Sequence, residues 1–420
     1  MEGFRVLGGE RLEGRVRLEG AKNAVLPILA ASLLPEGETV IRDCPDIRDV
    51  RAMAKILETL GCRCRMEDGC MRVDSGSVTG YEMPEGLSKQ IRSSIFLLGP
   101  ILGKMRKATV PYPGGCEIGL RPIDLHLKGL RALGVEISEG GGVLHCDGKN
   151  MRSGQVHFDY PSVGATENVM MAAALLPGIT TVSNAAREPE IRDLQGFLNA
   201  MGGKVRGAGT SVIEIEGVRL LRPAAYTPIP DRIAGGTYLC AGAVTGGGIC
   251  LENVRMEDLL PVTDKLSEMG CLVRREKDRL ILEAPGRLRA FSRLQTQPHP
   301  GFPTDMQAQM LSIACTAAGT SVIVENVFEN RLGHVADLCR MGADIRVSGR
   351  TAVVQGVEKL EGMTVRARDL RGGAALVLAG LAAEGETRVE NAALIDRGYA
   401  HLEDTLRALG ARIERIQINE

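Results

Sequence analysis

The fold is decided by a stretch near the N-terminus, NAVLPILAASLLPEGETVIRD at residues 23–43, followed by DVRAMAKILETLGCRCR at residues 49–65. The first part predicts an apolar helix of small residues that leads through a glycine into a strand. The second part predicts an amphipathic helix that ends in Leu-Gly, where glycine suits a left-handed C-cap, and then another strand. Alternating segments such as LVRREKDRLILEA, residues 272–284, predict the hairpins that follow.

This two-helix unit recurs along the whole chain, giving six copies at a period of roughly 70 residues, longer than the repeats of common solenoid proteins. A solenoid is therefore the weaker architecture, and the pattern favours an α/β fold. The later copies place their first helices near Arg92, Ala165, Ala234, Asp305 and Arg371. The second helices of the six copies are expected to end at Gly61, Gly134, Gly202, Gly270, Gly342 and Gly410.

The ends of the chain indicate how the copies are grouped. The last copy stops after ARIERIQI without its final strand, while residues 4–20 have a strand pattern with no helix before them. We therefore expect residues 1–21 to pack with the C-terminal half. With one crossing near Gly20 and another in the proline-rich residues 220–232, we predict two three-copy domains, 22–229 and 1–21 plus 230–420, with the active site in the cleft between them.

Composition limits the classes of function. The chain has 420 residues, a formal net charge of -1 and a pI near 6.6, which argues against a nucleic-acid-binding surface. The N-terminus lacks the apolar core of a signal peptide, and no apolar run approaches the length of a membrane span. We expect a cytoplasmic protein that binds neither nucleic acid nor membrane.

The eleven cysteines form no CxxC pairs, and several lie in apolar helical runs, as Cys240, Cys315 and Cys339 do. They are interpreted as buried thiols, not as a disulfide framework. Cys62, Cys64 and Cys70 lie close together, but no histidine is near, so we expect core and surface thiols there. No metal site is predicted.

The starts of the first helices carry mostly small or polar residues, which suit anion binding because helix N-termini expose amide groups. They are Lys22-Asn23, Arg92 to Ser94, Ser162 to Gly164, Gly235-Gly236, Thr304-Asp305 and Arg371 to Gly373. Taken singly, Ser93 and Ser162 are better interpreted as N-caps. Lys22, Arg92 and Arg371 stand out, because a basic side chain opposes the helix dipole unless an anion intervenes.

The second copy departs most from the pattern, with the insertion VPYPGGCEIGLRPIDLH at residues 110–126. Two glycines precede Cys116 and suit a loop that moves. Arg121 would favour the thiolate of Cys116, which makes this cysteine a candidate reactive group, whereas the alternative is an incidental thiol. Asp124 and His126 are interpreted as loop and helix-start contacts rather than as a partner of Cys116.

The second half offers further candidates. Asp305 in GFPTDMQAQ is a candidate general base whose alternative role is an N-cap. Arg331 and Arg397 occupy matching loops of the fifth and sixth copies, and the third copy has Arg187 and Glu190 there. Arginines gathered in such loops would need an anion, which suggests a substrate with phosphate and carboxylate groups.

These motifs resemble the UDP-N-acetylglucosamine 1-carboxyvinyltransferase family of enolpyruvyl transferases over essentially the full length. The segments that carry the resemblance are GAKNA, RSSIFLLGP, PGGCEIGLRPIDLH, SVGATEN, NAAREPEIRD, GFPTDMQAQ, VFENR, DLRGGAALVLAG and IDRGY. The resemblance implies a two-domain inside-out α/β barrel, each domain built from three βαβαββ-like units. It also implies transfer of the enolpyruvyl group of phosphoenolpyruvate to the 3-hydroxyl of UDP-N-acetylglucosamine, through a tetrahedral intermediate and with release of phosphate.

Site residues follow from the same resemblance. Cys116 matches the general acid, which also forms a covalent adduct with phosphoenolpyruvate, and Asp305 matches the residue at the sugar hydroxyl. Lys22, Arg121 and Arg397 match the charges that bind phosphoenolpyruvate, supported by Arg331 and Arg371. The remaining matches are sugar-nucleotide or phosphate contacts: Asn23, Arg92, Arg121, Pro122, Ile123, Asp124, Leu125, Ser162, Val163, Gly164 and Val327.

Two departures concern Phe96, where some relatives carry Trp, and Tyr160-Pro161, where some carry Lys-Val; both bear on the nucleotide and interdomain contacts. No metal, organic cofactor or obligate protein partner is implied. Two alternatives stay open. One is the sister transferase that acts on shikimate 3-phosphate, which lacks the Cys116 loop, and the other is a non-catalytic paralogue that binds the sugar nucleotide.

Overall fold

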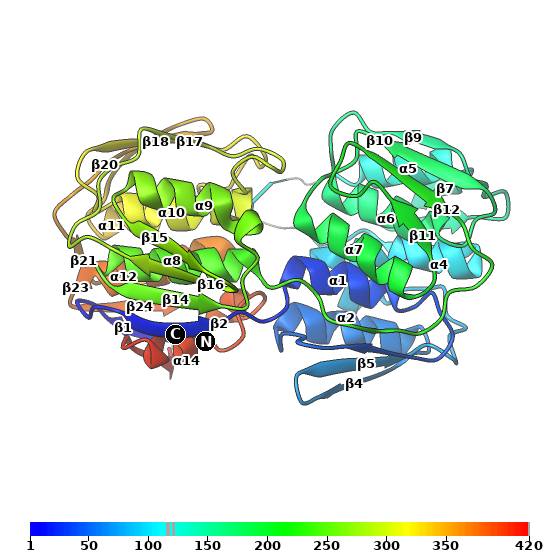
Figure 1. Cartoon of the computed structure of the whole chain (residues 1–420), viewed down its shortest axis with the longest axis horizontal. Helices are drawn as coiled ribbons and strands as arrows, with labels where there is room; N and C mark the ends of the chain where they lie inside the picture. The colour runs from blue at the N-terminus through cyan, green and yellow to red at the C-terminus, as the bar shows by residue number, and fades with distance from the viewer. Residues whose placement is uncertain (115–117, 120–121, 419–420) are drawn as a thin grey trace. The chain divides into compact units, whose positions relative to one another are not determined.

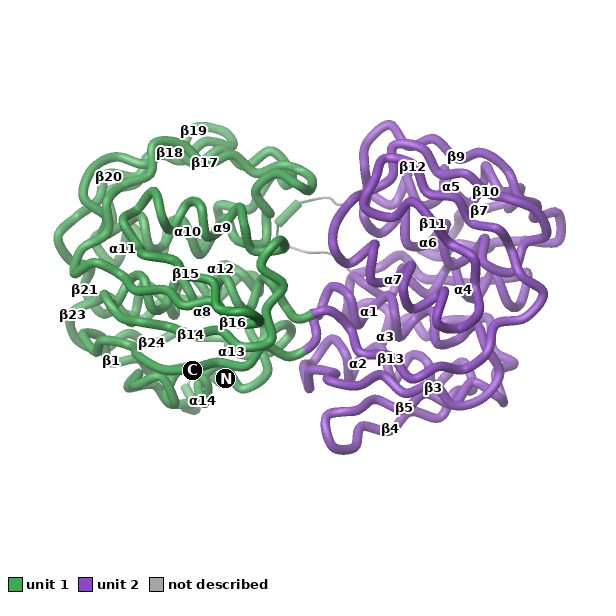
Figure 2. Tube along the Cα trace, in the orientation of Figure 1, with its two compact units in different colours: residues 1–19, 116–120, 230–420 green, residues 20–115, 121–229 purple. Residues whose placement is uncertain are grey.

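A computed structural model of the chain describes residues 1–114, 118–119 and 122–418, which divide into two compact units (Figures 1 and 2). Unit 1 comprises residues 1–19, 116–120 and 230–420, and unit 2 comprises residues 20–115 and 121–229. Apart from the short segment 116–120, the chain passes from unit 1 to unit 2 after Glu19 and returns after Ile229. In this short segment the Ile118 carbonyl accepts a hydrogen bond from Asn330 N at 3.1 Å.

Unit 1 contains three four-stranded sheets and one two-stranded sheet among its described residues. The first sheet has the order β15-β16-β14-β2, with strands Leu272–Glu276, Arg279–Glu283, Gly248–Glu252 and Glu13–Arg17. The second has the order β17-β18-β20-β19, with strands Arg293–Gln295, Thr320–Val324, Thr351–Gln355 and Asp344–Ser348. The third has the order β22-β24-β1-β25, with strands Thr364–Arg366, Glu386–Glu390, Glu2–Leu7 and Arg412–Gln417, and β21 (Leu360–Glu361) pairs with β23 (Ala383–Glu384).

The three larger sheets share one pairing pattern. An edge strand runs parallel to its neighbour, and the next two pairings are antiparallel, as in β17 with β18, β18 with β20, and β20 with β19. In the third sheet the N-terminal strand β1 lies between β24 and β25 and is antiparallel to both, with Phe4 opposite Val389 and Arg415. The start of the chain therefore packs with its C-terminal part, as expected for these residues.

Apolar helices form the centre of unit 1. Helices α8 (Arg232–Val244), α10 (Gln307–Ala314) and α12 (Leu370–Ala382) contact one another and are buried on nearly every side. Amphipathic helices alternate with them along the chain and bury one face only: α9 (Met256–Glu268), α11 (Val335–Arg340) and α14 (Leu402–Ala408). Two short elements complete the unit, η2 (Thr304–Met306) before α10 and α13 (Ala392–Ile395) after β24. The core lies between these helices and the sheets, because every second strand residue points inward.

Unit 2 repeats this organisation in its described residues. Its sheets have the orders β13-β3-β5-β4, β6-β8-β7 and β11-β12-β10-β9. The strands are β3 (Glu38–Ile41), β4 (Arg63–Glu67), β5 (Cys70–Asp74), β6 (Lys107–Pro111), β7 (Glu136–Gly140), β8 (Val143–Asp147), β9 (Gln155–His157), β10 (Ile179–Ser183), β11 (Lys204–Arg206), β12 (Val212–Glu216) and β13 (Ala225–Tyr226). The helices are α1 (Lys22–Ala31), α2 (Arg48–Thr59), α3 (Glu85–Ser88), η1 (Arg92–Leu97), α4 (Leu98–Met105), α5 (Asp124–Ala132), α6 (Val163–Ala173) and α7 (Pro189–Ala200).

Two local predictions are confirmed and one is wrong. Residues 272–283 form the antiparallel hairpin β15–β16, and each of the six predicted helix-terminal glycines has a positive φ, between 88° at Gly134 and 104° at Gly61. The ten described cysteines are free, but Cys339 is exposed. The reason is that Val335 and Leu338 fill the buried face of the short helix α11, and Cys339 falls outside it.

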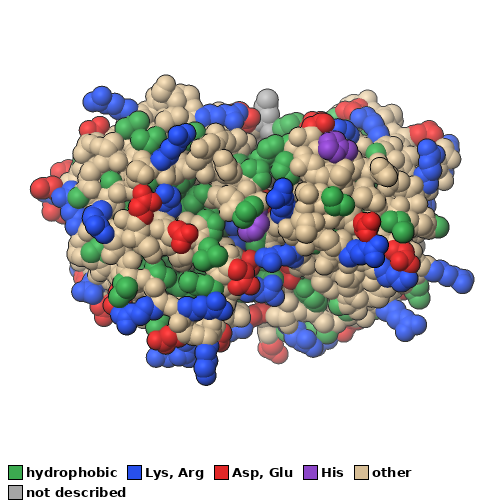
Figure 3. All heavy atoms as spheres, turned by 45° about the horizontal axis from the view of Figure 1, so that its top comes forward, with side chains coloured by type: hydrophobic (Ala, Val, Ile, Leu, Met, Phe, Trp, Pro, Cys, Tyr) green, Lys and Arg blue, Asp and Glu red, His purple; other side chains and the backbone are tan. Residues whose placement is uncertain are grey.

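The balance of basic and acidic residues in the composition is also seen on the surface. Lysine and arginine side chains are interspersed with aspartate and glutamate over the face drawn in Figure 3. Among the helices in the described ranges, none combines the length and the apolar character needed to cross a membrane.

The glycine ends of the second helices give a stability prediction. At Gly342, φ is +97° and an added Cβ would meet no atom within 4 Å, so only backbone conformation opposes a side chain there. Gly342→Ala should therefore lower the free energy of unfolding by about 1–2 kcal/mol, and Gly342→Asn should cost less because asparagine tolerates positive φ. The measurement is urea unfolding of the full chain followed by circular dichroism, since the chain has no tryptophan.

Gly286 provides the matched control in the same unit. An added Cβ would also meet nothing within 4 Å there, and Gly286 is not among the glycines with positive φ. Gly286→Ala should leave stability unchanged or raise it by up to about 1 kcal/mol. Equal losses at the two positions would contradict the role of backbone conformation.

Candidate active site

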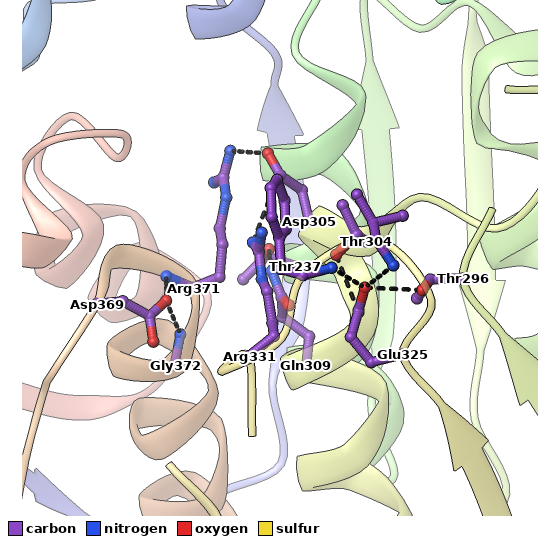
Figure 4. A network of polar contacts seen from close by, with 12 residues as sticks. Thr237, Thr296, Thr304, Asp305, Gln309, Glu325, Arg331, Asp369, Arg371 and Gly372 are labelled. Atoms are coloured by element: carbon purple, nitrogen blue, oxygen red, sulfur yellow. Dashed lines mark hydrogen bonds and ion pairs between the residues drawn. The ribbon is translucent and has the colours of Figure 1, made fainter. Parts of the chain in front are cut away.

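Asp305 in unit 1 binds two arginines that come from distant parts of the chain (Figure 4). Asp305 lies in η2, Arg331 follows β18 by a loop, and Arg371 lies in the first turn of α12. Arg331 Nη2 donates to Asp305 Oδ1 at 2.8 Å, and Arg371 Nη2 donates to Asp305 Oδ2 at 3.2 Å. Three of the residues expected at the site are therefore in direct contact.

The charges of this cluster do not balance. Arg331 and Arg371 are 3% and 2% exposed, whereas the side chain of Asp305 is 25% exposed. Nε of both arginines and Nη1 of Arg371 have no hydrogen-bond partner within the described residues. Buried guanidinium groups normally use their donors, so the arrangement suits a bound anion that would accept the remaining ones.

Aromatic and polar side chains orient the two guanidinium groups. Arg371 lies over the Tyr399 ring at 5.3 Å, and Arg331 lies over the Phe328 ring at 5.3 Å. The hydroxyls of Tyr399 and Thr237 are 2.8 Å apart, which anchors Tyr399 to α8. Burial disfavours the charged form of Arg371, but Tyr399, Asp305 and Asp231 together raise its pKa above the usual value. Arg371 therefore stays charged.

His334 adds no further positive charge below this cluster. It is buried directly before α11, and burial lowers the pKa of His334 to about 4. Nearby Asp369 and Asp337 favour the charged imidazole, while Arg331 opposes it. The imidazole is neutral near pH 7, and the positive charge of the site stays on its arginines.

Two other predicted residues of unit 1 lie in neighbouring loops. Arg397 lies in the half-buried turn after α13, two residues before Tyr399. The preceding residue, Asp396, is held by Arg415, whose Nη1 and Nη2 donate to its two carboxylate oxygens at 3.0 and 2.7 Å. Val327 is half-buried, and its amide donates to Glu325 Oε1 at 2.8 Å.

Unit 2 has its own buried ion pair at the start of a central helix. Lys22 is the first residue of α1 and is 8% exposed, and its Nζ lies 2.9 Å from Asp49 Oδ2 in the first turn of α2. Asp49 satisfies the requirement for an anion beside a basic residue at a helix start. Asn23 follows Lys22 and is half-buried.

The other predicted residues of unit 2 surround the start of α6. Ser162 caps α6 by accepting a hydrogen bond from Ala165 N, which confirms its interpretation as an N-cap. Gly164 permits a close approach, because an added Cβ would lie 2.9 Å from His126 Cε1 and 3.0 Å from Phe96 Cε1. Val163 adjoins it in α6.

His126 and Arg92 are held by separate contacts. Nδ1 of His126 lies 2.7 Å from Asn168 Nδ2, which agrees with a helix-start contact. Arg92 begins η1, and its Nη1 donates to the Pro113 carbonyl at 3.4 Å. In the segment before His126, Pro122 and Asp124 are exposed, Ile123 is buried and Leu125 is half-buried.

The helix starts correct part of the anion-site hypothesis. Asp231 caps α8 and Asp369 caps α12, each accepting two backbone N–H groups, so these amides are already occupied. Gly235 and Gly236 lie inside α8, where an added Cβ would meet Leu18 and Met306 at 2.9 Å, so they serve helix packing. The alternative role of Asp305 as an N-cap is wrong, because Asp305 lies inside η2, whose N-cap position is Pro303, and its carboxylate binds the two arginines.

Cys116 and Arg121 lie outside the described residues. For the described part of the chain, no group of three or more His, Cys, Asp or Glu side chains is placed to hold a metal ion.

Sequence reasoning singled out Glu190 but missed the other buried acids at the starts of the second helices. Five of the second helices carry, in their first turn, an acid that is buried, and those acids are Asp49, Glu190, Asp258, Asp337 and Glu403. The related segments PDIRD and PEIRD, residues 45–49 and 189–193, share a final aspartate that is buried in both, as Asp49 and Asp193. Tyr399 carried no comparable signal, because its partner Thr237 is distant in the sequence. Glu325 was missed as well, since its partners Thr296 and Thr304 belong to other segments.

Comparison with known proteins extends over the whole chain. The family model described as EPSP synthase (3-phosphoshikimate 1-carboxyvinyltransferase) matches residues 6–406. UDP-N-acetylglucosamine 1-carboxyvinyltransferase 2 of Caldanaerobacter subterraneus is 51% identical, with 98% of this chain and 99% of that protein covered. UDP-N-acetylglucosamine 1-carboxyvinyltransferase 1 of Symbiobacterium thermophilum is also 51% identical, with 99% and 95% covered.

Solved structures show the same fold. The enolpyruvyl transferase NikO from Streptomyces tendae matches with a TM-score of 0.90 and 25% identity, covering 99% of this chain and 98% of that one. EPSP synthase from Acinetobacter baumannii matches with a TM-score of 0.75 and 18% identity, covering 99% and 100%. The chain therefore belongs to the enolpyruvyl transferase family described as EPSP synthase (3-phosphoshikimate 1-carboxyvinyltransferase), together with enzymes named UDP-N-acetylglucosamine 1-carboxyvinyltransferase.

Proposed function

We propose that this chain transfers the enolpyruvyl group of phosphoenolpyruvate to the 3-hydroxyl of UDP-N-acetylglucosamine, releases phosphate, and so performs the first committed step of peptidoglycan synthesis. The observation that carries the proposal is the cluster of Arg331, Arg371 and Asp305, with buried donors left for an anion. The names and the 51% identity of full-length relatives support the choice of substrates.

The reaction needs one acid, one base and charges that neutralise phosphate and carboxylate. In our proposal the thiol of Cys116 protonates the methylene carbon of phosphoenolpyruvate, and the sugar hydroxyl attacks the neighbouring carbon while Asp305 accepts its proton. The tetrahedral intermediate then loses a proton from the new methyl group and expels phosphate, which restores the double bond. Asp305 suits a base because part of its carboxylate is exposed while two arginines hold it in place.

The proposed substrate contacts are those that the resemblance to the family implies. Lys22, Arg121, Arg331, Arg371 and Arg397 are proposed to bind phosphoenolpyruvate. The sugar nucleotide is proposed to contact Asn23, Arg92, Arg121, Pro122, Ile123, Asp124, Leu125, Ser162, Val163, Gly164 and Val327. The capping role of Ser162 and the close packing at Gly164 support a preorganised start of α6.

We also propose the finer architecture, an inside-out α/β barrel in each of two domains, 22–229 and 1–21 plus 230–420, with the active site in the cleft between them. The shared strand pairing of the sheets and the glycine ends of the second helices support six copies. We propose a cytoplasmic location, which the free thiols of the ten described cysteines support, because disulfides are rare there.

Two alternatives give different outcomes. A transferase for shikimate 3-phosphate is disfavoured by the lower identity of the EPSP synthase structure, 18%, against 51% for the sugar-nucleotide relatives. A non-catalytic paralogue is disfavoured because the chain retains Lys22, Cys116, Asp305 and Arg397.

The first prediction is turnover itself. The purified chain should release phosphate from phosphoenolpyruvate only when UDP-N-acetylglucosamine is present, because the hydroxyl of the sugar is the attacking group. A phosphate-release assay with either UDP-N-acetylglucosamine or shikimate 3-phosphate measures this. Release with shikimate 3-phosphate would favour the sister enzyme, and no release with either acceptor at saturation would favour the paralogue.

A second prediction concerns Arg371. Arg371→Lys keeps the positive charge but loses the forked donors and the planar stacking on Tyr399, so the KM for phosphoenolpyruvate should rise about tenfold or more. Arg368→Lys is the matched control, because Arg368 is 51% exposed and pairs with Asp337 at 3.7 Å. Steady-state kinetics of both variants test this, and equal effects would refute a specific role for Arg371.

A third prediction concerns Cys116. The epoxide fosfomycin should alkylate this thiol, because the proposed general acid is also a nucleophile as thiolate. Buried thiols are poor competitors, since burial raises the pKa of Cys62 to about 12 and that of Cys146 to about 11. Mass spectrometry should find one adduct that Cys116→Ser abolishes and that Cys339→Ser, which removes an exposed thiol, retains. An adduct lost with Cys339→Ser would sink the assignment.

A further inference from the structure

Glu325 is a buried carboxylate that follows β18 and accepts four hydrogen bonds (Figure 4). It is 1% exposed. Its Oε1 accepts from Thr296 Oγ1 at 2.9 Å, from Val327 N at 2.8 Å and from Phe328 N at 3.1 Å. Its Oε2 accepts from Thr304 Oγ1 at 2.9 Å. All four donors are neutral groups, so no ion pair among them explains why a charged side chain is buried here.

The four donors belong to three separate segments. Thr296 follows the edge strand β17, Thr304 is the first residue of η2, and Val327 and Phe328 belong to the loop after β18. Asn326 strengthens the link to Thr296, because its amide N–H donates to Thr296 Oγ1 at 2.9 Å and its Nδ2 donates to the Thr296 carbonyl at 3.1 Å. One carboxylate therefore ties the end of a sheet to two loops.

Each loop leads to a group of the proposed active site. Thr304 is directly followed by Asp305, and η2 has no side-chain cap of its own. Phe328 lies under the guanidinium of Arg331 at 5.3 Å, and Val327 is a proposed sugar-nucleotide contact. The two oxygens of Glu325 thus hold different parts of the site. Oε2 binds the residue before Asp305, and Oε1 binds the loop of Val327 and Phe328.

We propose that Glu325 is a positioning residue for enolpyruvyl transfer, which acts through Thr304 on the place of Asp305 and through Val327 and Phe328 on the loop that carries Arg331. This inference rests on the proposed function. A carboxylate suits the task because it presents several lone pairs at fixed angles, and charge-assisted hydrogen bonds are stronger than neutral ones. Such support matters because small misplacements of a catalytic group lower the rate steeply.

The first test removes the hydrogen bond between Thr304 and Glu325 Oε2 without removing the hydrogen bonds at Oε1. Thr304→Val removes the hydroxyl that binds Oε2 and leaves the three bonds of Oε1 in place. We expect kcat to fall about tenfold or more, while the KM for UDP-N-acetylglucosamine stays within about twofold. Thr304→Ser keeps the hydroxyl and should restore kcat to near the wild-type value.

A matched control excludes a general loss of stability. Thr263 in α9 of the same unit is 3% exposed and donates to the Leu260 carbonyl at 3.1 Å, so Thr263→Val makes the same change away from Asp305. Thermal unfolding should show that both Thr304→Val and Thr263→Val are folded at the assay temperature, but only Thr304→Val should lose kcat. Equal kcat in the two variants, or no recovery in Thr304→Ser, would overturn the inference.

Glu325 itself is tested with two replacements. Glu325→Gln keeps an oxygen for the three donors at Oε1, and its amide can donate to the Thr304 hydroxyl oxygen, so activity should stay within about threefold of wild type. Glu325→Ala removes the hydrogen bonds of both oxygens. It should therefore lower kcat and also raise the KM for UDP-N-acetylglucosamine. Wild-type kinetics for Glu325→Ala would also overturn the inference. Absence of turnover in the wild-type chain would instead reject the proposed function.

Discussion

Two guanidinium groups are buried around one carboxylate in unit 1, and the neighbouring elements are arranged to hold them there. Taking Arg331 and Arg371 out of water is costly, and Asp305 leaves some of their donors without a partner among the described residues. The aromatic faces of Phe328 and Tyr399 and the polar contacts of Thr237 keep the side chains oriented without neutralising them. A pair buried in this way has the orientation and the spare donors that an anionic substrate requires.

Unit 2 also buries a basic side chain, but there the charge is paired with one carboxylate. Lys22 at the start of α1 is matched by Asp49 in the first turn of α2, and both are buried. In unit 1 the buried first-turn acids Asp337 and Glu403 pair instead with the more exposed Arg340 and Arg415. An acid in a first helical turn is favoured by the helix dipole in every copy. The acid in the first turn is therefore a structural feature of these helices, which differ in the basic residue that the acid binds.

The two ends of the chain are joined by strand pairing and by ion pairs. The N-terminal strand β1 lies between β24 and β25 and joins them into one sheet, because each of them pairs with β1. Arg415 in β25 then binds Asp396, Glu403 and Glu2, so the turn that carries Arg397 is tied to both ends of the chain. Two helix starts in unit 1 are closed by Asp231 and Asp369, whereas η2 is held through Glu325 and leaves Asp305 available for the arginines.

The sequence by itself determined the features that depend on near neighbours in the chain. The hairpin of residues 272–283, the glycine ends of the second helices and the Ser162 cap follow from periodicity and local backbone preference, which act over a few residues. The residue types of the site were also visible, because basic residues at helix starts and arginines in matching loops are unusual without an anion. Tertiary structure alone decided which of them meet. Asp305 joins residues 26 and 66 positions away, and Thr237 joins Tyr399 across 162 positions. Such pairs depend on how helices and strands pack, because only packing brings together side chains that no local pattern relates.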